Sequence, residues 1–148
     1  MRTLAQLCIP RESVFNKSHR DVVLDLTDLI EDKINPGEFF NENYRTDGMR
    51  SLFREAFRRF EGKEASGIIR LTQAMGGGKT HNLIALGLLA KNPQYRSKVI
   101  GDMSIQYDNR PVRVVAFTGR ESDAPLGIWG TIAEQLGKKE QFNEYYSF

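Results

Sequence analysis

The chain has 148 residues and a formal net charge of +2, with 40% hydrophobic and 27% charged residues. This length allows one domain at most, and the near-balanced charge gives no whole-chain argument for nucleic-acid binding. A single cysteine, Cys8, excludes an internal disulfide framework, and two histidines argue against a zinc site. No apolar run reaches the roughly 20 residues of a membrane span or forms a signal peptide, so we expect a cytoplasmic protein without membrane contact.

The N-terminal part of the sequence is predicted to be helical. Residues 1–17 form an irregular lead-in, and Ser18 with Asp21 fits a capping box that opens a helix to about Ile30. The alternation within 22–26 would also fit a strand. A turn is predicted at Asn35-Pro36-Gly37. A second helix, capped by Thr46 and ended by Gly62, carries one apolar face: Met49, Leu52, Phe53, Ala56, Phe57 and Phe60.

The second half alternates predicted strands and helices. Segment 66–72 is predicted to be a strand, and 80–91 a helix so apolar that it should be buried against a sheet. Segment 112–117 is predicted to be a second strand, and about 126–136 a helix that ends at Gly137. Two strands joined through a helical crossover should be parallel, with a right-handed connection.

These elements predict an α/β fold, namely an incomplete P-loop NTPase with a parallel sheet and a helical N-terminal segment. We divide the chain into a helical segment, 1–62, packed on the ATPase, and the start of a truncated P-loop NTPase domain, 63–148. The truncation is expected because only two strands are visible, whereas sheets average five or six.

The most informative segment joins the first predicted strand to the apolar helix. Gly76, Gly77 and Gly78 lack Cβ atoms, so their backbone amides can approach and cradle phosphate oxygens. Lys79 adds a cation that can reach the β- and γ-phosphates, and the Thr80 hydroxyl is placed to ligate Mg²⁺. The helix that follows directs its unpaired amides and positive dipole end to the same point. The segment therefore predicts binding of ATP with magnesium.

The loop departs from the usual G-x-x-x-x-G-K-[ST] pattern at one position, because Gln73 stands where the first glycine is expected. A dinucleotide-binding fingerprint that starts at Gly76 would need a third glycine where the chain has His81. His81 lies in the first turn of the predicted helix, where it either contacts a phosphate or the base, or is simply packed.

No catalytic residue can be assigned from the sequence. Hydrolysis needs an acid at the end of a second strand to hold Mg²⁺, and a group that orients water. The strand at 112–117 ends without Asp or Glu, while Glu121 and Asp123 follow in a predicted loop. Asp25 and Asp102, each after a short apolar run, are weak alternatives.

The glycine loop and three further stretches resemble the N-terminal part of the domain-of-unknown-function 499 family, large prokaryotic predicted ATPases. The resemblance covers about residues 11–140. It rests on Leu71 to His81, Phe39-Phe40 through Tyr44-Arg45-Thr46, Phe57-Arg58-Arg59-Phe60, and Phe117-Thr118-Gly119-Arg120 with Ile128-Trp129-Gly130. It implies a P-loop ATPase of the additional-strand class, often encoded beside DNA methyltransferases and acting in DNA modification or phage defence. It makes Gln73 normal for the family. It also implies that the nucleotide is contacted by Gly76, Gly77, Gly78, Lys79 and Thr80.

Four other features of the sequence fit either a functional or a purely structural role. Arg50, Arg54 and Arg58 form a basic stripe that fits a solvated helix face better than a phosphate contact. Arg120 could sense a γ-phosphate but fits surface arginine better, and Trp129 is predicted to lie in the core. Arg70 is awkward inside a strand that is buried on both faces.

Two alternatives to an ATPase module stay open. One is a fragment that binds nucleotide without hydrolysing it, or serves as a scaffold, which the missing acid favours. The other is a phosphotransferase or nucleotide switch built on the same loop. A GTPase is disfavoured because the chain has no Asn/Thr-Lys-x-Asp guanine reader.

Overall fold

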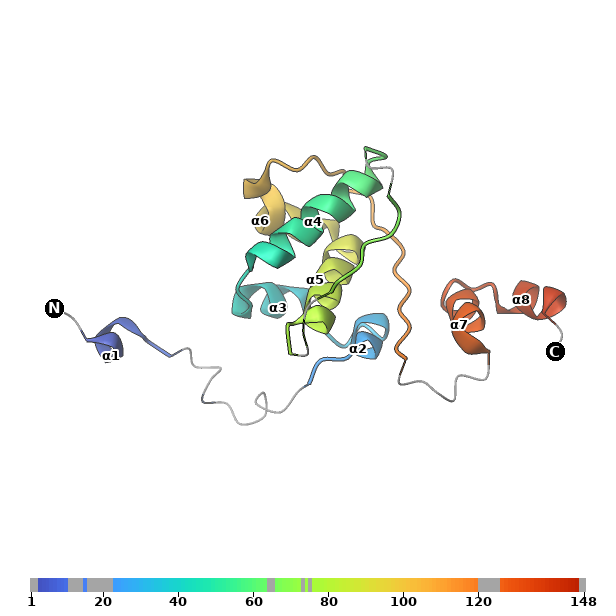
Figure 1. Cartoon of the computed structure of the whole chain (residues 1–148), viewed down its shortest axis with the longest axis horizontal. Helices are drawn as coiled ribbons and strands as arrows, with labels where there is room; N and C mark the ends of the chain where they lie inside the picture. Colours follow the sequence, from blue (N-terminus) through green and yellow to red (C-terminus); the bar gives the residue numbers. More distant parts are fainter. Residues whose placement is uncertain are drawn as a thin grey trace.

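The computed structural model describes residues 3–10, 15, 23–63, 66–72, 74, 76–119 and 126–146. Throughout these ranges the regular structure is helical, and no strand is present (Figure 1). The helices are α1 Leu4–Leu7, α2 Leu26–Ile30, α3 Pro36–Glu42, α4 Asp47–Phe60, α5 Lys79–Lys91, α6 Arg96–Ile100, α7 Gly127–Gln135 and α8 Lys139–Tyr145, with the 3-10 helices η3 Pro93–Tyr95 and η4 Gly101–Met103.

Helix α5 is the centre of the hydrophobic core. It contacts α2, α3, α4 and η3, and Figure 1 shows it between α4 and α2. The contacts follow from its composition, because apolar side chains on all sides leave little surface for water. The core therefore joins both halves of the chain; its buried residues are Leu29, Phe39, Met49, Phe53, Phe57, Ile84, Ala85, Leu88, Leu89, Val99, Ile100 and Met103.

Helix α4 confirms its sequence prediction at both ends. The Thr46 hydroxyl accepts a hydrogen bond from the Met49 amide at 3.3 Å. At the other end Gly62 has a φ of +72°, and the amides of Gly62 and Lys63 donate to the carbonyls of Arg59 and Arg58. This is a Schellman motif, which satisfies carbonyls that the helix itself leaves unpaired.

The segment before α4 differs in detail from its prediction. The predicted cap at Ser18 and Asp21 lies outside the described residues, and in the described part the helix begins later. Asp25 caps α2 by accepting from the Thr27 amide, while Val23 is 87% exposed and contributes nothing to the buried face. The predicted turn at Asn35 is the start of α3, since the Asn35 side chain accepts from two amides and Pro36 occupies the first helical position.

The α/β fold with a parallel sheet, predicted from 66–72 and 112–117, is wrong for the described residues. Figure 1 draws both segments as plain ribbon, one leading from α4 to the glycine loop and the other leading towards α7. A strand needs a neighbouring strand as partner, and neither segment has one among the described residues. The backbone of 112–117 bonds to helices instead. The Val112 amide donates to the Ala90 carbonyl at 2.8 Å, and the Gln135 side chain bonds both the amide and the carbonyl of Ala116.

The absence of a sheet in this region also changes the surroundings of several side chains. Ile68, predicted to be a buried strand residue, is 84% exposed. Arg70 is exposed as well, so its charge lies at the surface and not in a strand that is buried on both faces. Helix α5 is buried as predicted, but it packs against helices and not against a sheet.

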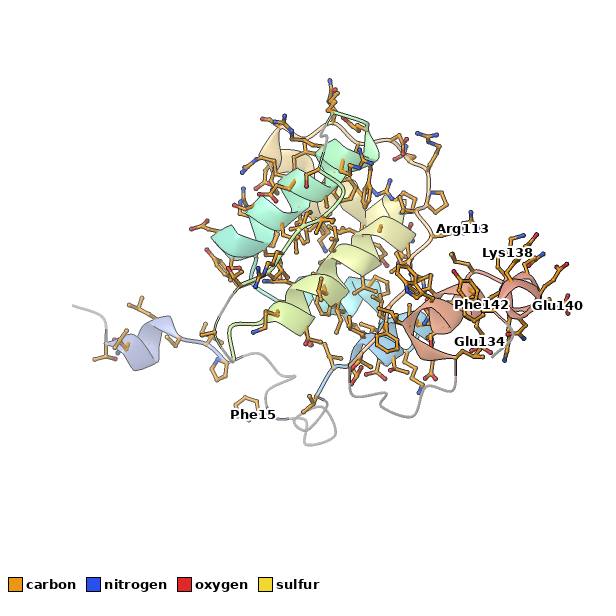
Figure 2. All side chains as sticks on the ribbon, turned by 45° about the vertical axis from the view of Figure 1, so that its right-hand side comes forward. Phe15, Arg113, Glu134, Lys138, Glu140 and Phe142 are labelled. Carbon is orange, nitrogen blue, oxygen red and sulfur yellow. The ribbon has the colours of Figure 1, made fainter. Side chains whose placement is uncertain are left out.

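Helices α7 and α8 form a pair, and Figure 2 shows Glu134, Lys138, Glu140 and Phe142 gathered in it. The two helices lie close together at Gly130, where an added Cβ atom would be 3.1 Å from the Phe142 ring. The core position predicted for Trp129 is therefore wrong: the small residue faces the neighbouring helix, and Trp129 is 70% exposed. Among the described residues, every helix is too short or too polar to cross a bilayer.

Candidate functional site

The glycine loop has the backbone that its sequence predicts. Gly76 and Gly78 have φ values of +78° and +73°, in the left-handed region that side chains with a Cβ rarely adopt. Gly78 is also the N-cap of α5, and its carbonyl accepts from the Asn82 amide at 2.9 Å. An added Cβ would meet nothing within 4 Å at either position, so backbone angle and not space requires glycine there.

Two hydrogen bonds hold the loop together through the Ala74 carbonyl. The Gly77 amide donates to it at 3.0 Å, and so does the Lys79 ammonium, also at 3.0 Å. The first amides of α5, those of Lys79, Thr80 and His81, have no acceptor within the helix. Lys79 is half-buried and Thr80 is exposed, so the positive end of the helix dipole faces solvent beside the Lys79 side chain.

The setting of the loop differs from the prediction. We expected it at the end of a parallel strand, but 66–72 pairs with no other backbone segment in the described structure. One amide of the loop, that of Gly77, is also already bonded within the loop. What the sequence predicted correctly is the local unit, a left-handed glycine turn that leads directly into α5 with Lys79 and Thr80 in its first turn.

His81 is packed against helix α3. Its ring stacks on Phe39 of α3, with ring centroids 4.8 Å apart and an interplanar angle of 27°. Burial lowers the pKa of His81, since the charged form loses hydration there. The packed alternative is thus correct, while a contact of the same ring with phosphate or base stays a prediction.

An open pocket of about 910 Å³ lies in front of the loop. One side is formed by 76–81, which contains every nucleotide contact that the sequence predicted. The opposite side, which we call the α2–α3 wall, was missed by sequence reasoning because no motif marks it. It consists of Leu24, Asp28, Lys33, Ile34, Asn35, Glu38, Phe39, Glu42 and Asn43.

The two sides of the pocket have opposite electrostatic character. The glycine loop offers amides, the helix dipole and Lys79, all of which favour an anion. The α2–α3 wall carries the carboxylates of Asp28, Glu38 and Glu42. Its cation, Lys33, is paired with Glu31, and that hydrogen bond raises the pKa of Lys33.

The weak candidates for a magnesium-binding acid have other roles. Asp25 caps α2. Asp102 is bound by Arg50 and Arg45, at 3.1 and 3.2 Å, and the hydrogen bond from Arg50 holds the pKa of the Asp102 carboxyl below its usual range. In the part of the chain that the structure describes, no three His, Cys, Asp or Glu side chains are arranged to hold a metal. The other two acids, Glu121 and Asp123, lie outside the described residues, and so do Gln73 and Arg120.

Comparisons with known proteins agree with the resemblance seen in the sequence. A family model described as the DUF499 N-terminal domain matches residues 9–146, which is nearly the whole chain. Searches of curated proteins and of solved structures found no match. Because the family model extends over far more than half of its length, the chain belongs to the DUF499 family, of which it contains the N-terminal domain.

Proposed function

We propose that this domain binds ATP with magnesium through Gly76, Gly77, Gly78, Lys79 and Thr80. The observation that carries the proposal is the conformation of the loop. Two left-handed glycines lead into the 13-residue helix α5, with Lys79 at its first position and an open pocket in front. Convergent amides at such a helix N-terminus, next to an ammonium group, are a donor set that fits a polyphosphate.

The proposal gives separate roles to the two left-handed glycines, to Lys79 and to Thr80. Gly76 and Gly78 keep the backbone open so that phosphate oxygens can approach the amides. Lys79 exchanges the Ala74 carbonyl, its hydrogen-bond acceptor at 3.0 Å, for phosphate oxygens of higher charge. The exposed Thr80 hydroxyl would hold Mg²⁺, which would supply positive charge to offset that of the phosphates.

The wider role that we propose follows from the family. The DUF499 resemblance implies a cytoplasmic ATPase that acts in DNA modification or phage defence, beside a DNA methyltransferase system. In this proposal the full-length protein would make the contacts with DNA. Within this domain we propose no DNA contact, since the basic stripe on α4 includes Arg50, which is paired with Asp102.

A second candidate function is nucleotide binding without hydrolysis, as a scaffold or switch. It is favoured by the roles of Asp25 and Asp102, which are engaged in a helix cap and in arginine pairs. A phosphotransferase would need an acceptor site next to the loop, and the acidic α2–α3 wall gives no specific support for one.

Calorimetric titration with ATP and Mg²⁺ tests the proposal. Lys79→Ala removes a charge-assisted hydrogen bond to phosphate and should lower the affinity about 10- to 100-fold. Lys98→Ala is the matched control, because it removes an exposed lysine of α6 whose partner is Asn41. An unchanged affinity in Lys79→Ala would refute the phosphate-binding role of the loop.

Phosphate release separates the two candidate functions. With or without DNA, we expect no turnover above background from this domain alone, because no carboxylate in it has been assigned to hold magnesium and no residue to orient water. Robust hydrolysis that Lys79→Ala abolishes would instead identify a complete catalytic site within these 148 residues.

A further inference from the structure

We infer that the α2–α3 wall binds the nucleoside half of the nucleotide, so that the N-terminal segment is part of the ligand site. This inference rests on the proposed function, since it takes the glycine loop as the phosphate end. It adds a second subsite for the sugar and base, formed by Leu24, Ile34 and the carboxylates of the wall.

The size of the pocket is the first argument. Pockets for whole cofactors and drug-sized ligands have volumes of about 300–1,000 Å³. The pocket in front of the loop, with about 910 Å³, lies near the top of this range. A triphosphate held at 76–80 would occupy only part of it, and the remaining space extends to the α2–α3 wall.

Charge decides which part of the ligand faces the wall. Asp28, Glu38 and Glu42 would repel a second anionic group, and Lys33 is paired with Glu31 at the surface. A nucleoside, in contrast, carries hydroxyl and amine donors that carboxylates accept well. One oxygen of Asp28 accepts from the Asp25 amide at 3.0 Å, which leaves the other as an acceptor for such a donor.

The wall also offers apolar surface on rigid supports. Leu24 and Ile34 are half-buried and pack against the hydrophobic core, while their remaining surface borders the pocket. Side chains held in this way give a planar base a firm apolar contact. Asn35, which also lines the wall, is held in place as the N-cap of α3, because its Oδ1 accepts from the amides of Gly37 and Glu38. Its Nδ2 is then left to donate to a ring nitrogen of the base.

A comparison of two ligands tests the inference, namely ATP and inorganic tripolyphosphate, each titrated with Mg²⁺ into the full chain. Ile34→Ala should lower the affinity for ATP about five- to tenfold, as expected for lost apolar contact with the ligand. The affinity for tripolyphosphate should stay within about twofold, because that ligand has no group to contact the wall. Leu24→Ala should give the same pattern and serves if Ile34→Ala does not fold.

Ile105→Ala is the matched control, because Ile105 is also a half-buried side chain packed on the core but does not line the pocket. It should change neither affinity. If Lys79→Ala weakens both ligands while Ile34→Ala and Leu24→Ala leave ATP binding unchanged or weaken both ligands equally, the nucleoside subsite is refuted and the phosphate loop stands. If Lys79→Ala changes neither ligand, or if ATP does not bind at all, the proposed function fails and the nucleoside subsite with it.

Discussion

The rings of Phe39 and His81 stack with centroids 4.8 Å apart, which joins α3 to the first turn of α5. Phe39 is 5% exposed and belongs to the core, so the histidine beside the glycine loop is held by the same cluster that folds the N-terminal segment. The two halves of the chain are thereby joined at the lining of the pocket. A substitution of either ring should therefore change both the stability of the domain and the conformation of the loop.

The first prediction concerns pH. Burial places the pKa of His81 in the folded state below about 6.5, the usual value for an exposed histidine. Between these two pKa values the unfolded chain binds more protons, so the free energy of unfolding falls as pH is lowered below about 6.5. Above about pH 6.5 the histidine is neutral in both states, so its ionisation no longer lowers the free energy of unfolding. Urea unfolding at a series of pH values between about 5 and 7.5 measures it.

The check on this titration is a substitution of the histidine itself. His81→Gln should remove the part of the pH dependence that lies just below about pH 6.5. An unchanged pH profile in His81→Gln would show that another group is responsible.

The second prediction concerns Arg96, a charged residue that is only 1% exposed. Its guanidinium donates to the carbonyls of Leu89, Ala90 and Asp108 at 2.9, 2.8 and 2.6 Å and lies 5.3 Å from the centre of the Phe57 ring. Arg96→Met would remove this donor from the carbonyls of Leu89 and Asp108, and would leave the Ala90 carbonyl with the Val112 amide as its donor. We expect a loss of about 3 kcal/mol or more in the free energy of unfolding, measured by denaturant titration.

Arg96→Lys should be nearly as damaging, because a single ammonium cannot reproduce the planar fork of donors. Arg110→Met is the control, since Arg110 is exposed and pairs with the same Asp108 at the surface. It should cost less than about 1 kcal/mol. Equal effects of Arg96→Met and Arg110→Met would contradict the capping role.

The third prediction concerns the close approach of α2 and α5. A Cβ added at Gly87 would lie well inside van der Waals contact with Cδ2 of Leu29, a fully buried side chain. Overpacking costs about 1–3 kcal/mol, which exceeds the gain of about 1 kcal/mol from replacing a helical glycine by alanine. Gly87→Ala should therefore lower the free energy of unfolding by about 1 kcal/mol.

A double-mutant cycle provides the check. In the Leu29→Ala background the clash is gone, so Gly87→Ala should become stabilising by about 0.5–1 kcal/mol through helix propensity alone. If Gly87→Ala has the same effect in both backgrounds, the two helices do not meet at this point.

The fourth prediction concerns the conformation of Gly78. Its φ of +73° costs about 1–2 kcal/mol for residues other than glycine, and asparagine tolerates it better than alanine does. ATP affinity should therefore decrease in the order glycine, asparagine, alanine at this position, measured by calorimetry. Gly119→Ala, at a glycine without a positive φ and outside the pocket, should leave it unchanged. Equal binding by Gly78→Ala would mean that the left-handed turn is unnecessary.

Local signals explain which elements the sequence predicted well. The Thr46 cap, the 3.6-residue periodicity of α4 and the glycines after α4 and α7 all act within a few residues, and all appear in the structure. The short helices α3 and α6 were missed because their sequences are too brief to show a period. Trp129 was misplaced because periodicity marks an apolar stripe without saying whether a neighbour covers it.

The same distinction holds for the site. Chain-local chemistry determined the glycine turn at 76–78, Lys79 and Thr80 in the first turn of α5, and membership of the family. Only the tertiary structure decided that 66–72 and 112–117 form no sheet within the described residues, and that α2 and α3 provide the second wall of the pocket. The physical reason is range: caps and turns are closed within one segment, whereas a strand and a pocket each need a partner that folding alone brings near.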